Sequence, residues 1–195
     1  MPSEPRVTVL STEEILRRAI FRWVNIRFTF RRFDGTVSEP IERIVLDRGD
    51  SVGIVVHDLS SNTVILVEQL RIATLGQGSG WLLEIPAGTV EEGDTPEETA
   101  LREMSEETGA PPVEIQLISS FFLSPGGSSE LLHLFYAPYS GGLEVADHAG
   151  LVKEGEDIRV WRFPLAEALE MLDKKTVVDA KTIIGLSWLK GHTAR

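Results

Sequence analysis

Cysteine is missing from all 195 residues of the chain. Disulfides, thiolate zinc sites and a cysteine nucleophile are therefore excluded. The histidines are scattered and show no metal-ligand spacing; they are His57, His133, His148 and His192. No segment approaches the roughly 18 apolar residues of a membrane-spanning helix, and residues 1–18 lack the apolar core of a signal peptide. We expect a soluble, cytoplasmic protein.

Positive charge is also scarce. Lys and Arg number 19 against 30 Asp and Glu, which gives a net charge of −11. Nucleic acids and anionic membranes attract clustered Lys and Arg, so we expect neither as a partner. If the substrate is itself an anion, metal ions must bridge it to the protein.

Strand-like and helix-like segments follow one another without a regular β–α–β repeat. Residues 19–46 are rich in β-branched and aromatic side chains, and the turn signal Asp34-Gly35 predicts a hairpin there. Further strands are predicted at residues 52–56, 63–67, 114–122, 131–136 and 158–163, and helices at residues 164–172 and 179–189. The pattern favours an α+β fold with a mixed, layered sheet.

A third helix has clear start and stop signals. Thr95 is a good N-cap, Pro96 occupies the first helical position, and Glu98 completes a capping box three residues after the cap. Gly109 is a typical C-terminal stop. The sequence therefore predicts a helix between Thr95 and Gly109.

This helix gathers carboxylates on one face. At about 100° per residue its apolar side chains share one side, and Glu103, Glu106 and Glu107 share another. A solvated acidic face is the commoner meaning of such a run. However, like charges at this spacing cost a few tenths of a kcal/mol per pair. Arg102 adjoins the cluster, and a backbone carbonyl of the preceding loop could complete an all-oxygen site suited to Mg²⁺.

Residues 88–110 resemble the Nudix box, Gly-x5-Glu-x7-Arg-Glu-U-x-Glu-Glu-x-Gly-U, in which U is apolar. One position departs from the pattern, because Asp94 stands where the box has its first Glu. The resemblance implies the Nudix α/β/α sandwich with a mixed central sheet, preceded by an N-terminal antiparallel β region. It also implies hydrolysis of a nucleoside diphosphate linked to another moiety.

The same resemblance implies roles for the residues of the box. Glu103 and Glu107 match the main metal ligands, the Ala87 carbonyl a further ligand, and Glu106 a nearby partner. Arg102 would orient the carboxylates by charge-assisted hydrogen bonds rather than touch the substrate. Mg²⁺ is the expected metal, with Mn²⁺ as the alternative.

The resemblance extends over about residues 40–190 and is closest to the branch of ADP-ribose pyrophosphatases and GDP-mannose hydrolases. In the acidic loop of residues 150–158, Glu154 matches the catalytic base and Glu156 a residue that reaches a metal. Glu130, at the end of the Ser-Pro-Gly-Gly-Ser-Ser-Glu segment, is a rival for the base. If these segments have no catalytic role, residues 150–158 are a solvated acidic loop and residues 124–130 are an ordinary turn.

Substrate contacts are expected from Arg71, Arg43 and Arg48, which match substrate-binding segments of the branch, and from Phe28, which could stack on the base. The alternatives are a strand-end charge for Arg71 and a core position for Phe28. Relatives exchange N-terminal strands between two subunits, so residues 1–46 are predicted to be a dimerisation arm and residues 47–195 the hydrolase domain. The predicted assembly is a homodimer.

ADP-ribose, cleaved to AMP and ribose 5-phosphate, is the leading predicted substrate, and GDP-mannose or UDP-glucose is the alternative. A non-catalytic, nucleotide-sensing module with the same fold is a candidate from another class. A third candidate is an interaction protein whose acidic helix serves only solubility. Sensing modules usually lose glutamates of the box, whereas this chain keeps Glu103, Glu106 and Glu107.

Overall fold

A computed structural model describes residues 5–140, 143–151, 153 and 155–193. The chain divides into two compact units, residues 1–50 with 122–131 and residues 51–121 with 132–195. The loop of residues 122–131 thus belongs with the N-terminal strands. The sequence-based division between residues 46 and 47 stays a prediction.

The first unit is built on an antiparallel sheet in the order β1-β2-β3. Its strands are β1 (Val7–Arg18), β2 (Phe21–Phe30) and β3 (Ile41–Asp47). As the hairpin prediction requires, β2 and β3 pair antiparallel, and the Asp34 carboxylate accepts a 2.9 Å hydrogen bond from the Thr36 N–H in the turn between them. The sequence did not predict β1, because its residues mix charged and apolar side chains and all of them are exposed.

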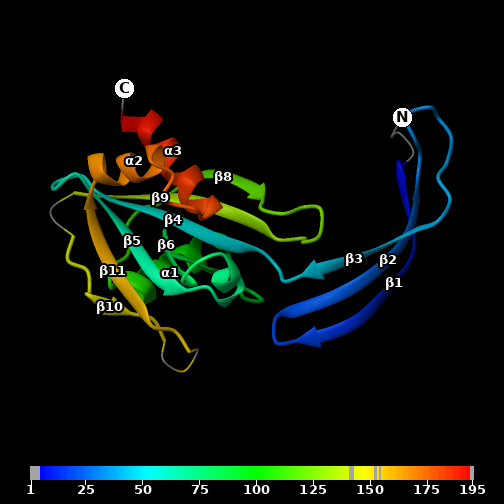
Figure 1. The fold of residues 1–195 in the computed structure, drawn as a ribbon, viewed down its shortest axis with the longest axis horizontal. Helices are drawn as coiled ribbons and strands as arrows, with labels where there is room; N and C mark the ends of the chain where they lie inside the picture. The colour runs from blue at the N-terminus through cyan, green and yellow to red at the C-terminus, as the bar shows by residue number, and fades with distance from the viewer. Residues whose placement is uncertain (1–4, 141–142, 152, 154, 194–195) are drawn as a thin grey trace. The chain divides into compact units, whose positions relative to one another are not determined.

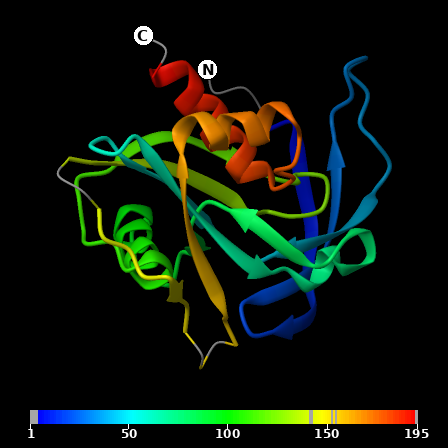
Figure 2. The same ribbon diagram turned by 60° about the vertical axis from the view of Figure 1, so that its left-hand side comes forward.

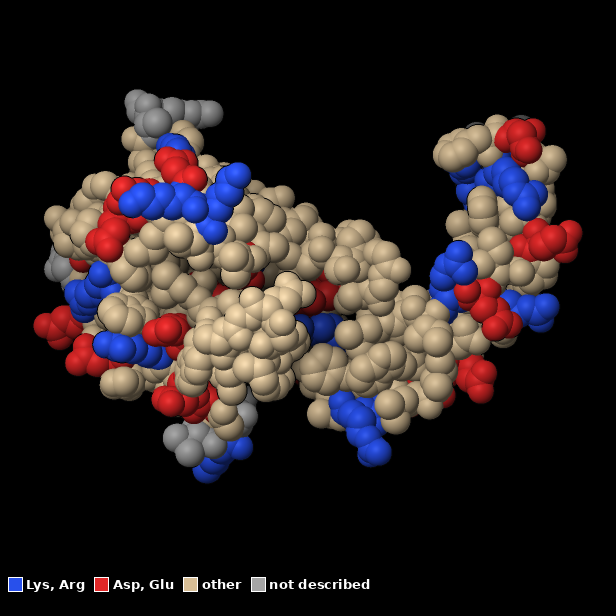
Figure 3. Space-filling view, in the orientation of Figure 1, with Lys and Arg blue, Asp and Glu red and all other residues tan. Residues whose placement is uncertain are grey.

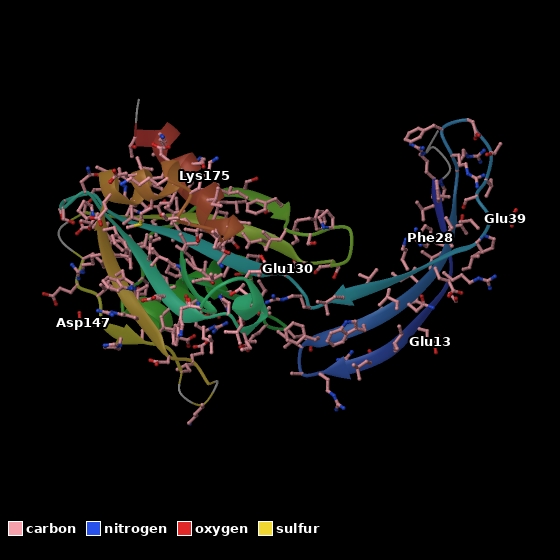
Figure 4. The ribbon with its side chains drawn as sticks, viewed as in Figure 1. Glu13, Phe28, Glu39, Glu130, Asp147 and Lys175 are labelled. Carbon is pink, nitrogen blue, oxygen red and sulfur yellow. The ribbon has the colours of Figure 1, made fainter. Side chains whose placement is uncertain are left out.

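The loop of residues 122–131 runs alongside β3. The Leu46 N–H donates to the Gly127 carbonyl at 2.8 Å, and the Ser129 N–H donates to the Leu46 carbonyl at 3.0 Å. The Ser129 hydroxyl also donates to the Asp47 carboxylate at 2.9 Å. These bonds fix the Ser-Pro-Gly-Gly-Ser-Ser-Glu segment, whose last residue, Glu130, is labelled in Figure 4.

The second unit holds a mixed sheet. Within the described residues its strands follow the order β10-β11-β5-β4-β9-β8, with β6 paired to β5 and β7 to β4. The pairing of β4 with β9 is parallel and that of β4 with β5 is antiparallel. The strands are β4 (Ser51–Asp58), β5 (Thr63–Leu70), β6 (Trp81–Glu84), β7 (Ala87–Thr89), β8 (Gln116–Phe122), β9 (Leu131–Tyr139), β10 (His148–Ala149) and β11 (Ile158–Pro164).

Helices cover both faces of this sheet, as Figures 1 and 2 show: α1 (Pro96–Thr108) lies on one face, and α2 (Leu165–Asp173) and α3 (Ala180–Thr193) lie on the other. Because side chains alternate along a strand, Ile54 of β4 packs in the core with Met104 of α1, whereas Val55 packs in the core with Leu186 of α3. Burial on both faces explains the nearly continuous apolar run of β4. The predicted layered α+β fold is confirmed.

The helix ends follow their sequence signals. The Thr95 side chain accepts a hydrogen bond from the Glu98 N–H and the Glu98 side chain accepts one from the Thr95 N–H, so the capping box forms. Gly109 ends α1 in the left-handed conformation, with φ 72°. A short 3-10 helix, η1 (Ile72–Gln77), joins β5 to β6. Searching the described residues for a helix able to span a membrane finds none.

Candidate functional site

The carboxylate of Glu107 is buried at the junction of α1, β5 and β7. Only 3% of the residue is exposed. The Ala87 N–H donates to Glu107 Oε2 at 2.9 Å, and the Gln69 side-chain amide donates to Glu107 Oε1 at 3.4 Å. Amide dipoles thus solvate this carboxylate. Sequence reasoning did not identify Gln69, because a Gln near a strand end carries no distinctive signal.

Glu103 lies one turn earlier on α1, with its carboxylate against the backbone of β7. A Cβ atom built on Gly88 would lie only 2.0 Å from the Glu103 carboxyl carbon. Any side chain at position 88 would therefore displace the Glu103 carboxylate. The glycine that opens the Nudix box is required here by this close approach, not by its backbone dihedral angles.

Arg102 holds two of the carboxylates. Its Nη1 atom lies 3.0 Å from Glu103 Oε1 and 2.9 Å from Glu106 Oε2. Glu106 is one helical turn from Arg102, whereas Glu103 is its sequence neighbour. A guanidinium bonded to both acids restricts their positions, which is the geometry that the predicted orienting role requires.

Burial and mutual repulsion raise the pKa values of the two inner carboxyl groups. For Glu103, burial raises the pKa to about 7, with the Arg102 charge opposing the rise and the charges of Glu106 and Glu156 adding to it. For Glu107, burial raises the pKa to about 8 against the Ala87 hydrogen bond, and the charges of Glu103 and Glu156 add to the rise. Arg102 bonds to Glu103 and Glu106, whereas the groups that donate to Glu107 are amides.

Glu156 approaches the cluster from the loop that precedes β11. Its carboxylate accepts a 3.0 Å hydrogen bond from the Leu151 N–H, and its charge acts on both Glu103 and Glu107. That Glu156 reaches a metal stays a prediction. Glu154, the predicted base, lies outside the described residues.

The donors of this cluster fit a hard cation. Among the described residues, no three His, Cys, Asp or Glu side chains converge to enclose a metal. Mg²⁺ does not need such a cage, because it keeps several waters and binds through one or two carboxylates together with substrate phosphates. The inner carboxylates of Glu103 and Glu107, and the β7 backbone at Ala87, offer only oxygen ligands. Carboxylate and carbonyl oxygens are the ligands that a hard cation prefers.

The Arg71 guanidinium, predicted to bind substrate, is largely engaged within the protein. Its Nε and Nη2 atoms each donate to the Glu84 carboxylate at 2.9 Å, and 40% of the side chain remains exposed. The Lys181 ammonium group also donates to Glu84. Sequence reasoning missed Glu84 and Lys181. The one signal was that Glu84 stands among Leu82, Leu83 and Ile85, where a charge is unexpected.

The remaining candidates lie in the first unit. Arg48 Nη1 lies 3.6 Å from Glu130 Oε2, so a cation accompanies the rival base. Arg43 lies on β3, opposite Ile26 of β2, and is exposed. Phe28, labelled in Figure 4, lies on β2 with its ring centroid 6.5 Å from that of Phe30.

Acidic and basic side chains are interspersed over the face of the second unit that Figure 3 presents. This mixed surface agrees with the excess of acid in the composition, which is moderate and distributed. On this face, basic side chains therefore lie among acidic ones rather than in a broad basic patch.

The raised pKa values predict that the metal-free protein loses stability as pH rises. The folded state holds the Glu107 proton more tightly than the unfolded chain does, so it binds more protons between pH 4.5 and about 8. Stability therefore falls as pH rises through this window, and each tenfold difference in proton affinity between the two states corresponds to about 1.4 kcal/mol. Mg²⁺ should restore stability, and increasingly so as the carboxyl groups ionise. Urea unfolding in EDTA and in Mg²⁺ across this pH range measures both effects.

Glu107→Gln should flatten the pH dependence in EDTA and abolish the stabilisation by Mg²⁺. Glu92→Gln is the matched control, because Glu92 is exposed in the turn before α1; it should behave as the wild type. A Glu107→Gln curve that parallels the wild type, or keeps the full response to Mg²⁺, would show that no cation site depends on this carboxylate.

Comparison with known proteins extends these observations beyond the helix. The model of the NUDIX domain matches residues 47–184. GDP-mannose pyrophosphatases of Escherichia coli O1:K1 / APEC and of Shigella boydii serotype 4 are each 37% identical over 183 residues, covering 93% of this chain and 94% of theirs. A crystal structure of an ADP compounds hydrolase superposes with a TM-score of 0.71 at 23% identity, covering 98% of both chains. On the extent of these matches, the chain belongs to the NUDIX family.

Proposed function

We propose that this protein hydrolyses the diphosphate bond of a nucleoside diphosphate sugar in an Mg²⁺-dependent reaction, releasing a nucleoside monophosphate and a sugar phosphate. The observation that carries the proposal is the pair of carboxylates that the fold holds beside the β7 backbone: the buried Glu107, bonded to the Ala87 N–H, and the partly buried Glu103, which lies against Gly88. A diphosphate brings the oxygen ligands that complete such a site.

GDP-mannose is the substrate that we propose first. The support is the 37% identity to GDP-mannose pyrophosphatases across nearly the whole chain. ADP-ribose, the leading prediction from sequence, is the second candidate, favoured by the likeness of the Glu84-Ile-Pro-Ala-Gly88 segment to ADP-ribose enzymes. The two substrates share the diphosphate and differ in base and sugar, so the chemistry at α1 would be the same.

The chain's own residues would divide the work of hydrolysis. When bound, Mg²⁺ neutralises phosphate oxygens and lowers the pKa of a coordinated water. Glu103 and Glu107 would hold the cation with the Ala87 carbonyl, and Arg102 would keep the Glu103 and Glu106 carboxylates in place. A carboxylate within hydrogen-bond reach would take the proton of the attacking water. We assign that step to Glu154, with Glu130 as the alternative.

The two non-enzymatic candidates fit the structure less well. A solubility helix gains nothing from a carboxylate that is 3% exposed and whose pKa is raised to about 8. A sensing module needs no orienting arginine bonded to two box glutamates at 2.9–3.0 Å. Both features serve a reaction centre.

We also propose a homodimer assembled through the first unit. All of β1 is exposed, and its apolar side chains include Val7, Val9, Leu10, Ile15 and Leu16 at 44–58% exposure. Exposed apolar surface of this kind is typical of an interaction surface. We propose a second copy as the partner, because relatives exchange their N-terminal strands between two subunits. Sedimentation velocity at low micromolar concentration should show a dimer, and a single species at the 21.6 kDa monomer mass would contradict it.

A hydrolysis panel tests the substrate. With Mg²⁺ and GDP-mannose, ADP-ribose or UDP-glucose, chromatography should detect a nucleoside monophosphate and a sugar phosphate, with the highest kcat/KM for GDP-mannose. Glu107→Gln should lower kcat/KM by about 100-fold, whereas Glu92→Gln should not. Hydrolysis of none of the three would end the enzyme proposal, and a preference for ADP-ribose would replace the first substrate by the second.

Paired variants test the base. Glu154→Gln should lower kcat by about 10²- to 10⁴-fold, with loss of the acidic limb of the pH–rate profile. Glu130→Gln, which breaks the pair with Arg48, should act mainly on KM. Asp157→Asn, in the exposed part of the same loop, is the control and should leave both parameters near the wild-type values. If Glu130→Gln instead removes the acidic limb, Glu130 is the base.

A further inference from the structure

Glu84 is a fully buried carboxylate that the mechanism above does not use. It ends β6, and 1% of the residue is exposed. Burying a carboxylate is unfavourable unless it is paired and hydrogen-bonded. Arg71 and Lys181 both bond to it, so burial, which favours the neutral form, is outweighed and the pKa of Glu84 is lowered.

Arg71 and Glu84 form a bidentate ion pair. Nε donates to Oε1 and Nη2 donates to Oε2, each at 2.9 Å. This arrangement fixes the plane of the guanidinium as well as its position. Nη1 takes part in neither bond, and the side chain is 40% exposed. Burial opposes the charged form of Arg71, but the hydrogen bond and charge of Glu84, followed by the charge of Glu107, raise its pKa. The charge of Glu107, the acid at the centre of the proposed site, thus acts on Arg71.

The other half of the cluster ties β6 to the start of α3. Lys181 bonds to Glu84 and lies 3.1 Å from Asp179 Oδ1. Asp179 Oδ2 accepts hydrogen bonds from the N–H and hydroxyl of Thr182, at 2.9 and 2.6 Å. The Thr182 hydroxyl oxygen accepts in turn from the Ile85 N–H at 2.8 Å. The charges of Glu84, Asp179, Arg71 and Lys181 sum to zero.

We propose that Glu84 is a positioning residue of the hydrolytic site: it aims the Arg71 guanidinium at the diphosphate and, through Lys181, fixes the β6–β7 segment that carries Ala87. This inference rests on the proposed function. Ala87 follows Glu84 by three residues, and its N–H bonds to Glu107. Glu84 therefore acts on two parts of the site. It orients the Arg71 guanidinium, which would meet the anionic substrate, and it fixes the backbone at Ala87, beside Glu107.

A double-mutant cycle tests this role. Glu84→Gln keeps the size of the side chain but removes its charge and one acceptor, and should lower kcat/KM by about 10- to 100-fold. Arg71→Lys keeps the charge but loses the fork, and should cause a similar loss in the wild-type background. Because the Arg71 guanidinium is already misplaced in Glu84→Gln, adding Arg71→Lys to that variant should lower kcat/KM by less than about a further threefold.

Asp173→Asn is the matched control. Asp173 is exposed and pairs with Lys190, away from Glu84 and Arg71. Asp173→Asn should leave kcat/KM near the wild-type value and should leave the effect of Arg71→Lys unchanged. The positioning role would be overturned if the losses from Glu84→Gln and Arg71→Lys were additive, or if Glu84→Gln alone left kcat/KM unchanged.

Two further measurements keep the outcome decisive. If Glu84→Gln does not fold, Glu84→Asp retains the charge but shortens the reach, and its coupling to Arg71→Lys should be the same. The cycle is also measured as the calorimetric Kd for GDP and for ADP in Mg²⁺, which needs no turnover. A wild type that hydrolyses nothing would end the proposed function, whereas coupling in Kd would still report on Glu84; a cycle without coupling in Kd or kcat/KM overturns the inference itself.

Discussion

The site depends on one constraint, the burial of the Glu107 carboxylate among amide donors rather than beside a bonded cation. The Ala87 N–H and the Gln69 amide solvate it, but amides supply only partial charges, and its pKa rises to about 8. Several other features follow from this burial. The capping box sets the helical register that turns Glu107 inward. Gly88 leaves room for the neighbouring Glu103 carboxylate, and Arg102 bonds to that acid at 3.0 Å.

Two buried carboxylates in the same unit, Glu84 and Glu107, have pKa values shifted in opposite directions. Glu84 is 1% exposed and Glu107 is 3% exposed, yet the pKa of Glu84 is lowered and that of Glu107 is raised. Burial acts on both in the same direction, so the difference comes from bonded cations. Arg71 and Lys181 compensate Glu84 within the chain. The groups that donate to Glu107 are amides, so its pKa stays raised, a shift that is common among carboxylates at functional sites.

Sequence reasoning succeeded where the signals were local. The capping box, the Pro96 start and the Gly109 stop determined α1 within its own residues, and apolar runs located β4 and β5. It failed where structure depends on distant partners. β1 has no distinctive pattern and exists through its pairing with β2. The short strands β6 and β7 exist because β5 and β4 are adjacent to them. Glu84 could not be recognised, because Lys181, one of its two cations, is 97 residues away in sequence.

The same distinction separates the reaction from the choice of substrate. The residues that we propose to act on the diphosphate come from one helix and the adjoining strands of the second unit, so most of them fall within a contiguous motif. Residues proposed to contact base and sugar, such as Arg43, Arg48 and Phe28, belong to the first unit, which the loop of residues 122–131 joins from far along the chain. Substitutions on exposed strands usually have little effect on stability, whereas a side chain at Gly88 would displace the Glu103 carboxylate. In this chain the proposed hydrolytic residues and the proposed contacts to base and sugar belong to different units, which is why the motif identifies the bond that is cleaved more firmly than the sugar attached to it.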